Sequence, residues 1–352
     1  MRIKIADKII GQGRPVFIVA ELGLNHKGKM ELAKKMILEA KRAGADAVKL
    51  QSFVTEDFVN GKTSTVIYKS RGKTVTETQF MLFKRSEFSL GQQKELYAFA
   101  KNNCVILFSS PQDNSFNTVD FLCGREINMP AIKVGSDDLT NLAMLAYYAK
   151  KQKPMIISTG MADLAEVEEA VRAIKRQGNQ KIVILKCTSL YPTPPEEANL
   201  NQIKTLRQVF KDCLIGFSDH TQGAAAAVVA AALGACLIEK HFTLDHNLAG
   251  PEHWFAANPE ELSELVQKVR LAEKMFGNYQ FVLSKAEKNN KEIARRSIIA
   301  ARAIKKGQKI TAGDLEIKRP GTGLPPKYLL KIIGRLAKRH FTPGHIFNKK
   351  DL

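Results

Sequence analysis

Eight short apolar runs, each followed by a helical pattern, alternate along most of the chain. The predicted strands are residues 16–20, 47–50, 105–108, 131–134, 155–157, 182–185, 214–217 and 235–238. The predicted helices, in which apolar residues recur with helical spacing, are residues 30–43, 90–102, 115–122, 142–150, 164–176, 202–210, 224–233 and 260–276. Eight such units over roughly 270 residues predict an α/β fold of the (β/α)8 TIM-barrel type. A doubly wound open sheet is the alternative.

Two segments of this region lie outside the alternation. Residues 1–15 predict a short β-hairpin, with Gly11 and Gly13 at its turns. Residues 54–87 separate the second predicted strand from its helix and are rich in Thr, Lys and Ser. A loop of this length is typically a functional lid or a disordered segment. On a barrel it would lie over the active-site face.

The pattern changes after the barrel domain, which we place at residues 1–283. Residues 284–293 predict a charged linker, and residues 294–352 predict a small β-rich module. The last 68 residues contain 18 Lys and Arg against 5 Asp and Glu, so they carry +13 of the net charge of +19. Such a charge forms either a solvated basic face or an attractive field for an anion. A nucleic-acid or ice-binding module is the non-enzymatic alternative, but its aromatic residues are only Tyr328, Phe341 and Phe347.

The composition predicts a folded cytoplasmic protein. The hydrophobic content is 44%, and no apolar run reaches the roughly 20 residues needed to span a bilayer. The first ten residues, MRIKIADKII, lack the features of a secretory signal. The five cysteines are odd in number and include no CxxC pair, which predicts buried, reduced thiols.

Polar residues occur at the carboxyl end of every predicted strand, where barrels keep their chemistry. In chain order they are Glu21, Lys49, Gln51, Ser109, Ser110, Lys133, Ser136, Ser158, Lys186, Ser189, Tyr191, Ser218, His220, Glu239 and His241. Residues two apart in a strand share a face, so Ser218 lies with His220 and Glu239 with His241. If the last two strands are neighbours, the two imidazoles converge near carboxylates, which suggests a metal site. Two polar strand caps are the alternative interpretation.

Three lysines, Lys49, Lys133 and Lys186, lie within predicted barrel strands. Burying an ammonium group is costly unless an anion meets it, so these residues indicate a phosphate or carboxylate ligand. Ion pairs with Glu21 or Glu239 in the core would satisfy them equally well. A Schiff-base aldolase is a second enzymatic possibility. No GxxxxGK[ST] loop is present, which disfavours nucleotide hydrolysis.

Ten motifs along the chain resemble those of the sialic acid synthase family. They are AELGLNHKG (20–28), GADAVKLQSF (44–53), FSSP (108–111), IKVGS (132–136), ISTGM (157–161), CTSLYPTP (187–194), GFSDHT (216–221), EKHFT (239–243), GPEHWF (250–255) and KRPGTGLPP (318–326). These enzymes condense phosphoenolpyruvate with an N-acetylhexosamine to make nine-carbon sugar acids. The resemblance implies a TIM barrel followed by an antifreeze-like (SAF) domain. In the family that domain reaches across a homodimer to cover the partner's barrel mouth.

The resemblance also assigns roles to individual residues. His220 and His241 would hold a divalent metal, manganese or magnesium. The phosphoenolpyruvate site would consist of Lys49, Lys133, Ser136, Ser158 and Ser218, with Gln51 and Glu239 nearby. Glu21 and Glu252 would transfer protons or position water. The amino sugar would meet Asp138, Ser189, Tyr191 and Arg319 of the partner subunit.

Two positions depart from the family's usual pattern. Asp138 stands where these synthases commonly have Glu, and Ser189 stands where many have Asn. Both are on the sugar side, so the reaction is better determined than the sugar. The KRPGTG loop is more similar to sialic and legionaminic acid synthases than to pseudaminic acid synthases. N-acetylmannosamine, a 2,4-diacetamido-trideoxyhexose and a 6-phosphorylated mannosamine all remain candidate substrates.

Overall fold

Eight parallel strands close into a barrel in the order β10-β11-β12-β3-β4-β7-β8-β9 in this computed structural model. The strands are β3 (Phe17–Glu21), β4 (Ala47–Ser52), β7 (Ile106–Pro111), β8 (Ile132–Val134), β9 (Met155–Ser158), β10 (Ile182–Cys187), β11 (Leu214–Asp219) and β12 (Leu237–His241). Each corresponds to one predicted strand. The closed barrel confirms the predicted fold class over the open-sheet alternative, and it places all eight strand ends around one mouth.

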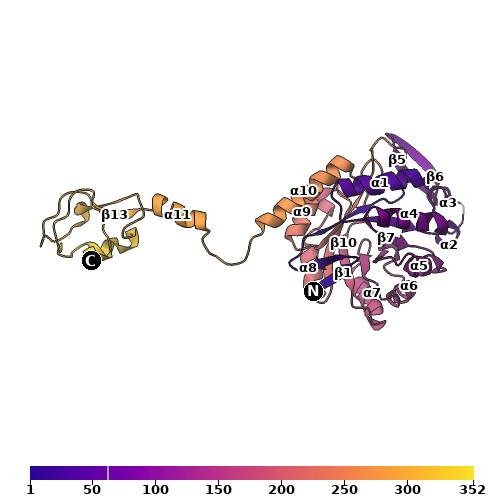
Figure 1. Ribbon diagram of the computed structural model, residues 1–352, viewed down its shortest axis with the longest axis horizontal. Helices are drawn as coiled ribbons and strands as arrows, with labels where there is room; N and C mark the ends of the chain where they lie inside the picture. The colour runs from indigo at the N-terminus through magenta and orange to yellow at the C-terminus, as the bar shows by residue number, and fades with distance from the viewer. Residues whose placement is uncertain (62) are drawn as a thin grey trace. The chain divides into compact units, whose positions relative to one another are not determined.

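Helices follow the strands and surround the barrel (Figure 1). They are α1 (Met30–Arg42), α4 (Leu90–Asn102), α5 (Asn117–Cys123), α6 (Leu142–Ala149), α7 (Leu164–Arg176), α8 (Gln202–Val209), α9 (Ala225–Ala232) and α10 (Pro259–Met275). Helix α7 shows why they form here. A capping box between Asp163 and Glu166 starts it, and its buried residues, among them Val167, Val171 and Ile174, recur with helical spacing.

The structure describes residues 1–61 and 63–352, which divide into two units, Met1–Gly277 and Asn278–Leu352. The first unit begins with the predicted hairpin, β1 (Arg2–Ile5) and β2 (Lys8–Gly11). Its turn is formed by Ala6 and Asp7, with Ala6 at a positive φ of 51°. The predicted glycines are therefore not in the turn between the two strands. They lie in a second turn, where the Arg14 N–H donates to the Gly11 carbonyl at 3.0 Å and the chain leads on to the barrel.

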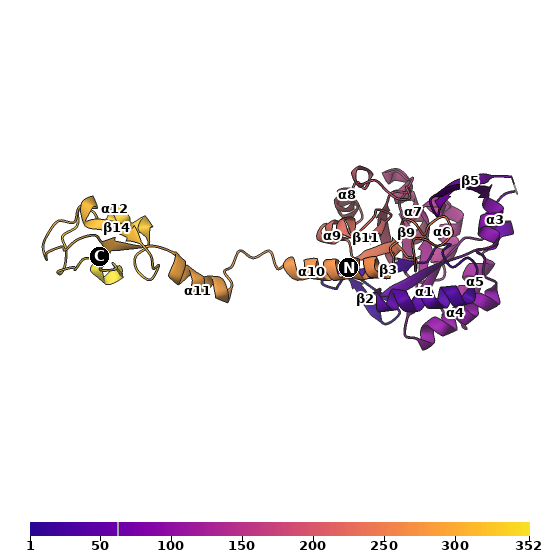
Figure 2. The ribbon, with the colours of Figure 1, turned by 90° about the horizontal axis from the view of Figure 1, so that it is seen from above.

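The insertion after β4 is folded rather than disordered. It contains α2 (Thr55–Phe58), the antiparallel pair β5 (Thr65–Ser70) and β6 (Lys73–Thr78), and α3 (Gln79–Lys84). Residue 62 lies outside the described residues. Helix α3 lies beside the hairpin in both views (Figures 1 and 2). A small apolar cluster that includes Phe53, Phe58 and Leu82 packs the insertion. Its hairpin tip contacts residues 245–250, because Ser70 Oγ accepts from the Gly250 N–H at 3.0 Å and Arg71 Nε donates to the Asn247 carbonyl at 2.9 Å.

The second unit has its own small core. It contains α11 (Lys285–Ala294), the antiparallel strands β13 (Ser297–Ala300) and β14 (Leu315–Lys318), and the short helix α12 (Leu329–Ile332). Most of the segment predicted as a linker is thus helical, with a capping box from Ser284 to Glu287. Phe341 and Phe347 are 1% and 0% exposed and belong to the core, so they offer no stacking surface for nucleic acid.

The structure also bears on the predictions made from composition about cysteines and membrane spans. All five cysteines are free thiols, as predicted. Cys187 and Cys213 are buried, but Cys104 is exposed, so the prediction of burial holds only in part. Among the described residues, no helix has both the length and the apolar character that crossing a membrane requires.

Candidate active site

Two lysines and two glutamates form a buried ionic network inside the carboxyl end of the barrel. Lys49 Nζ lies 3.0 Å from Glu21 Oε2 and donates to Glu239 Oε1 at 3.0 Å. Lys133 Nζ lies 3.6 Å from the same Glu239 oxygen. Strand pairing explains this arrangement, because Glu21 of β3 is in register with Lys49 of β4 and with His241 of β12. The four residues are each at most 4% exposed.

The network sets the charge of each of its members. Burial raises the pKa of Glu21. Burial alone would lower the pKa of Lys49, but Glu21 and Glu239 raise it above its usual value. Burial lowers the pKa of Lys133, and Glu239 offsets part of that effect. Burial alone would raise the pKa of Glu239, but the neighbouring Lys133 and Lys49 lower it to about 2. Glu239 therefore keeps both ammonium groups inside the barrel before any ligand binds.

Hydroxyl and amide groups lie at the same mouth. Gln51 Nε2 donates to Glu21 Oε1 at 3.2 Å, which fixes the second oxygen of that carboxylate. The buried Oγ atoms of Ser158 and Ser189 have no hydrogen-bond partner among the residues that the structure describes. Unpartnered buried hydroxyls are rare in folded proteins, so these two groups are suited to binding a ligand. Ser218, also buried, is paired in register with Glu239.

Gly160 brings two of these serines together. The Gly160 N–H donates to Ser136 Oγ at 3.0 Å. A Cβ at position 160 would lie 2.2 Å from Ser189 Oγ and 2.7 Å from Ser136 Oγ, which is too close for any side chain. The absence of a side chain at Gly160 thus leaves room for both hydroxyls beside the end of β9.

His220 is fixed in one orientation at the end of β11. Its Nδ1–H donates to the Thr188 carbonyl at 2.7 Å, and burial lowers the pKa of His220 to about 3. The ring is therefore neutral, and its Nε2 keeps a free lone pair. A backbone carbonyl that binds the other ring nitrogen is the usual support of a metal-ligating histidine.

His241 lies beside His220, with 5.3 Å between the ring centroids. Its Nδ1 lies 3.4 Å from Glu252 Oε2, and that oxygen accepts from the Leu24 N–H at 3.1 Å. Burial would lower the pKa of His241, but Glu252 raises it above its usual value. Glu252, expected to transfer protons or position water, therefore orients His241 in this structure.

The donor set fits a divalent metal through these two histidines. His220 Nδ1 is bound to the Thr188 carbonyl, and His241 Nδ1 lies near the Glu252 carboxylate, so Nε2 of each ring is the available nitrogen. No group of three or more His, Cys, Asp or Glu residues in the described part of the chain is arranged to hold a metal. Substrate or water oxygens would have to complete the coordination of an ion bound here.

Tyr191 forms a wall of the mouth over both imidazoles. Its ring centroid lies 4.2 Å from that of His220, 5.7 Å from that of His241 and 5.6 Å from that of Phe255. The side chain is nevertheless 48% exposed. A half-exposed aromatic face beside two imidazoles suits a sugar ring or an acyl methyl group.

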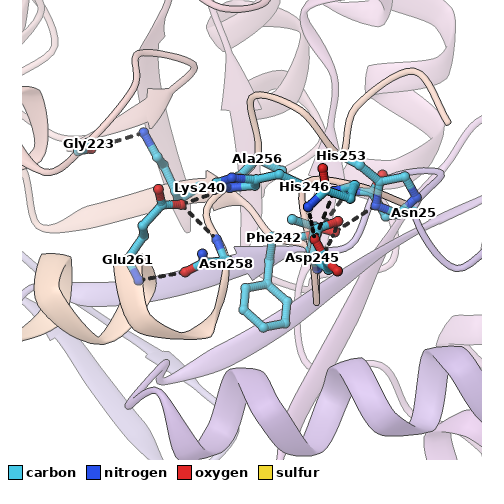
Figure 3. Close-up of polar contacts among 12 residues, drawn as sticks. Asn25, Gly223, Lys240, Phe242, Asp245, His246, His253, Ala256, Asn258 and Glu261 are labelled. Carbon is cyan, nitrogen blue, oxygen red and sulfur yellow. Dashed lines mark hydrogen bonds and ion pairs between the residues drawn. The ribbon is translucent and has the colours of Figure 1, made fainter. Parts of the chain in front are cut away.

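The loop after β12, residues 242–258, carries Glu252 and is held by polar contacts (Figure 3). Asn25 Nδ2 donates to the Phe242 carbonyl at 2.9 Å. At the other end, His246 Nε2 lies 3.0 Å from both the Ala256 carbonyl oxygen and Glu261 Oε2. Asn258 caps α10 by accepting from the Glu261 N–H. The contacts at both ends restrict where Glu252 can lie.

Asp138 and Arg319, both predicted to contact the sugar, lie in different units of the chain. Asp138 is half-buried in the short helix η1 (Ser136–Asp138), directly after β8, and is close to the mouth in the chain. Burial, assisted by Asp137, raises the pKa of Asp138 to about 7. Arg319 lies in the second unit, exposed, and has no ion pair within the part of the chain that the structure describes.

Sequence reasoning missed a second buried ion pair and the role of Lys186. Lys240 Nζ lies 2.9 Å from Asp219 Oδ2, and the two residues alternate with the inward-facing Ser218 and Glu239. This alternation was visible in the sequence.

Lys186 Nζ donates to the Cys187 carbonyl at 2.9 Å and to Thr188 Oγ1 at 2.6 Å. Lys186 therefore supports Thr188, the residue whose carbonyl binds His220.

Comparison with known proteins identifies the family of this chain. A family model described as the NeuB family matches residues 36–281, and one described as the SAF domain matches residues 295–352. An N,N'-diacetyllegionaminic acid synthase of Campylobacter jejuni is 38% identical, over 96% of this chain and 100% of its own length. An N-acetylneuraminate-9-phosphate synthase of Mus musculus is 37% identical, over 93% of this chain and 89% of its own length.

A solved structure extends the similarity to three dimensions. The crystal structure of an N-acetylneuraminic acid (sialic acid) synthetase from Leptospira borgpetersenii superimposes with a TM-score of 0.73 at 32% identity. The match covers 82% of this chain and 95% of that one. The two family models, the curated relatives and the solved structure all indicate the same family. The chain belongs to the NeuB family of sialic acid synthases and is an enzyme that forms sialic-type acids by condensation.

Proposed function

We propose that this enzyme condenses phosphoenolpyruvate with an N-acylated amino hexose and water, in the presence of a divalent metal, to give a nonulosonic acid and inorganic phosphate. One observation carries this proposal. The barrel mouth combines two buried ammonium groups, Lys49 and Lys133, with the unpartnered hydroxyls of Ser158 and Ser189 and with two converging imidazoles. Buried cations and free hydroxyls suit a phosphorylated carboxylate.

Lys49 and Lys133 would bind the phosphate and carboxylate of phosphoenolpyruvate, with Ser136, Ser158 and Ser218 donating further hydrogen bonds. Both ammonium groups are already held inside the barrel by Glu239. Fixed charges in a buried site stabilise an anion without the cost of reorganising water.

His220 and His241 would hold the metal, which when bound supplies a Lewis acid for the aldehyde oxygen of the sugar. Tyr191 packs over both rings and would orient the sugar above them. Thr188 orients His220 through a hydrogen bond, and the nearby Glu252 carboxylate would orient His241 by electrostatic attraction.

The bond changes are then as follows. Carbon 3 of phosphoenolpyruvate forms a bond to the aldehyde carbon of the sugar, and carbon 2 develops positive charge. The carboxylates of Glu21 and Glu239 would stabilise that charge. Water adds at carbon 2 and loses a proton, and the aldehyde oxygen gains one. The new hydroxyl on carbon 2 then passes its proton to the phosphate group as the C–O bond breaks, which leaves a ketone and releases phosphate. Because burial raises the pKa of Glu21, this residue is suited to carrying the proton.

Phosphate release tests the reaction directly. We expect manganese-dependent release of phosphate from phosphoenolpyruvate with N-acetylmannosamine or with 2,4-diacetamido-2,4,6-trideoxymannose, and its loss when a chelator is added. A 6-phosphorylated N-acetylmannosamine is the third substrate to compare. Covalent trapping by borohydride without any metal requirement would contradict the proposal and favour a Schiff-base aldolase.

Asp138 should make sugar binding pH-dependent. With a pKa of about 7, this side chain is neutral below that pH and a carboxylate above it. A carboxylate accepts stronger hydrogen bonds, so we expect the KM for the sugar to fall by roughly threefold or more between about pH 6 and about pH 8. Kinetics with Asp138→Asn should lose this dependence. Asp137→Asn should shift its midpoint to lower pH, since Asp137 contributes to the raised pKa. An unchanged profile in Asp138→Asn would exclude the assignment.

We also propose a domain-swapped homodimer in which Arg319 reaches the partner's barrel. Exposed apolar residues between α10 and α11, including Tyr279, Phe281 and Val282, support an assembly that covers them. Arg319→Ala should raise the KM for the sugar and leave that for phosphoenolpyruvate unchanged.

Mixed dimers give a sharper test of the swap. Each hybrid of an Arg319→Ala subunit with a His220→Ala subunit would contain one intact site. An equal mixture should therefore regain about a quarter of wild-type activity by random pairing, although each parent alone is impaired. Failure of the mixture to exceed its parents, with hybrid dimers shown to form, would rule out the exchange.

A further inference from the structure

A large basic groove lies at the edge of the barrel opposite the active site. It has a volume of about 1200 Å³ and is lined by the first residues of β7 and by the segments that lead into β8, β9 and β10. The β1 strand and the carboxyl end of α4 complete its walls. These are the amino-terminal ends of the barrel strands, whereas the ionic network and both histidines lie at the carboxyl ends.

The net charge of the barrel unit is concentrated in this groove. Residues 1–277 contain 36 Lys and Arg against 30 Asp and Glu, a net charge of +6. The groove is lined by seven of those cations and two of the acids, Asp7 and Glu126. The cations are Arg2, Lys4, Lys94, Lys101, Arg125, Lys153 and Lys181. The groove thus holds +5 of the +6, and the remainder of the unit is almost neutral.

Most of these cations are not neutralised by the protein. Only Lys94 has a carboxylate partner, Glu126, at 2.7 Å, within the described residues. The side chains of Lys4, Lys101 and Arg125 are exposed and make no hydrogen bond or ion pair in that part of the chain. Like charges held along one concave surface repel each other, so an anion that binds there relieves an unfavourable interaction.

The groove also has an apolar side. Val105, Ile106, Ile127 and Pro130 line it and are only partly buried. A simple inorganic anion would leave these side chains in water. A ligand with several phosphate charges attached to a ring would cover the apolar wall and meet the cations at the rim. The volume is ample for a ligand of that size.

We infer that this groove binds a nucleoside di- or triphosphate, at a site separate from the catalytic centre. The charged rim would hold the phosphates, and the wall formed by Ile106 and Ile127 would contact the base. This site does not depend on the reaction proposed above, because it shares no residue with the barrel mouth.

Calorimetric titration of the full-length protein with ADP tests the inference. The experiment is run at physiological salt with saturating phosphoenolpyruvate, so that the catalytic lysines are occupied. We expect ADP to bind, and adenosine, which lacks the charges, not to bind measurably. Lys101→Glu with Arg125→Glu should weaken ADP at least about tenfold, because two attractive charges become repulsive. Both side chains are exposed, so the double variant should keep its fold and its turnover.

Lys204→Glu is the matched control, because Lys204 is an exposed lysine on α8 outside the groove. We expect it to bind ADP as the wild type does. Four results would overturn the inference. These are no ADP binding, equal binding by the groove variant and the wild type, tripolyphosphate binding as tightly as ADP, and a short single-stranded RNA binding more tightly than ADP.

Discussion

Replacing His220 or His241 with alanine is expected to lower turnover by about a thousandfold or more while the barrel stays folded. Loss of a bound metal removes several kcal/mol of transition-state stabilisation, and each ~1.4 kcal/mol is tenfold in rate. Stability should change little, because His220 directly follows β11, His241 is the last residue of β12, and both lie outside the apolar core. Steady-state phosphate release and thermal unfolding measure the two effects.

Metal binding provides a readout that does not depend on turnover. Titration with manganese, followed by the electron paramagnetic resonance of the free ion, should show weaker binding in both variants. His340→Ala, which removes an exposed histidine of the second unit, should match the wild type in both assays. Near-normal activity of either active-site variant in metal-depleted buffer would contradict the proposed role.

Asp219→Ala is expected to destabilise the barrel by about 3–5 kcal/mol, the usual cost of leaving one buried charge without its partner. Asp219 and Lys240 are 0% and 3% exposed, and their charged groups lie 2.9 Å apart. Removing the carboxylate leaves the Lys240 ammonium with only carbonyl partners such as Gly223 O. Urea unfolding followed by tryptophan fluorescence reports on the barrel, since the single tryptophan is Trp254.

A surface ion pair supplies the comparison for this variant. Asp212 pairs with Lys175 but is 65% exposed, so Asp212→Ala should cost at most about 1 kcal/mol. The double variant Asp219→Leu with Lys240→Met should recover much of the lost stability, since no charge is then left buried. A loss below about 1 kcal/mol for Asp219→Ala would show that Lys240 finds other partners or water.

The apolar pattern located every barrel strand but ended several of them too early. Strand β12 was predicted at residues 235–238 and is Leu237–His241, and β11 continues through Asp219. Backbone hydrogen bonds do not depend on side-chain polarity, so the ladder continues into the polar residues of the mouth. A boundary drawn where apolar residues stop therefore falls short where strands carry functional groups.

The insertion was predicted less well, although part of its signal was present. Alternation in TVIYKS and KTVTET, with Arg71 and Gly72 between them, is typical of a β-hairpin. Both turn residues have positive φ, 51° and 73°. The contact of this hairpin with residues 245–250 was beyond prediction, because it depends on hydrogen bonds from side chains to backbone groups more than 170 positions away.

For the site, sequence could select the residues but not their partners. Two interpretations of Lys49 were open, a core ion pair or a ligand site, and the structure shows the ion pair with Glu21 and Glu239. The ligand role stays a prediction. The support of His220 by Thr188 was not visible, because it uses a backbone carbonyl and carries no residue signature.

The pairing of β12 with β3 joins the last barrel strand to the first, and His241 lies in register with Glu21 across that seam. The two residues are 220 positions apart in the chain. During synthesis, β3 can therefore pair with β12 only after β12 has left the ribosome. Closure of the barrel and assembly of the candidate site are one event, so a partly made chain cannot expose a complete site.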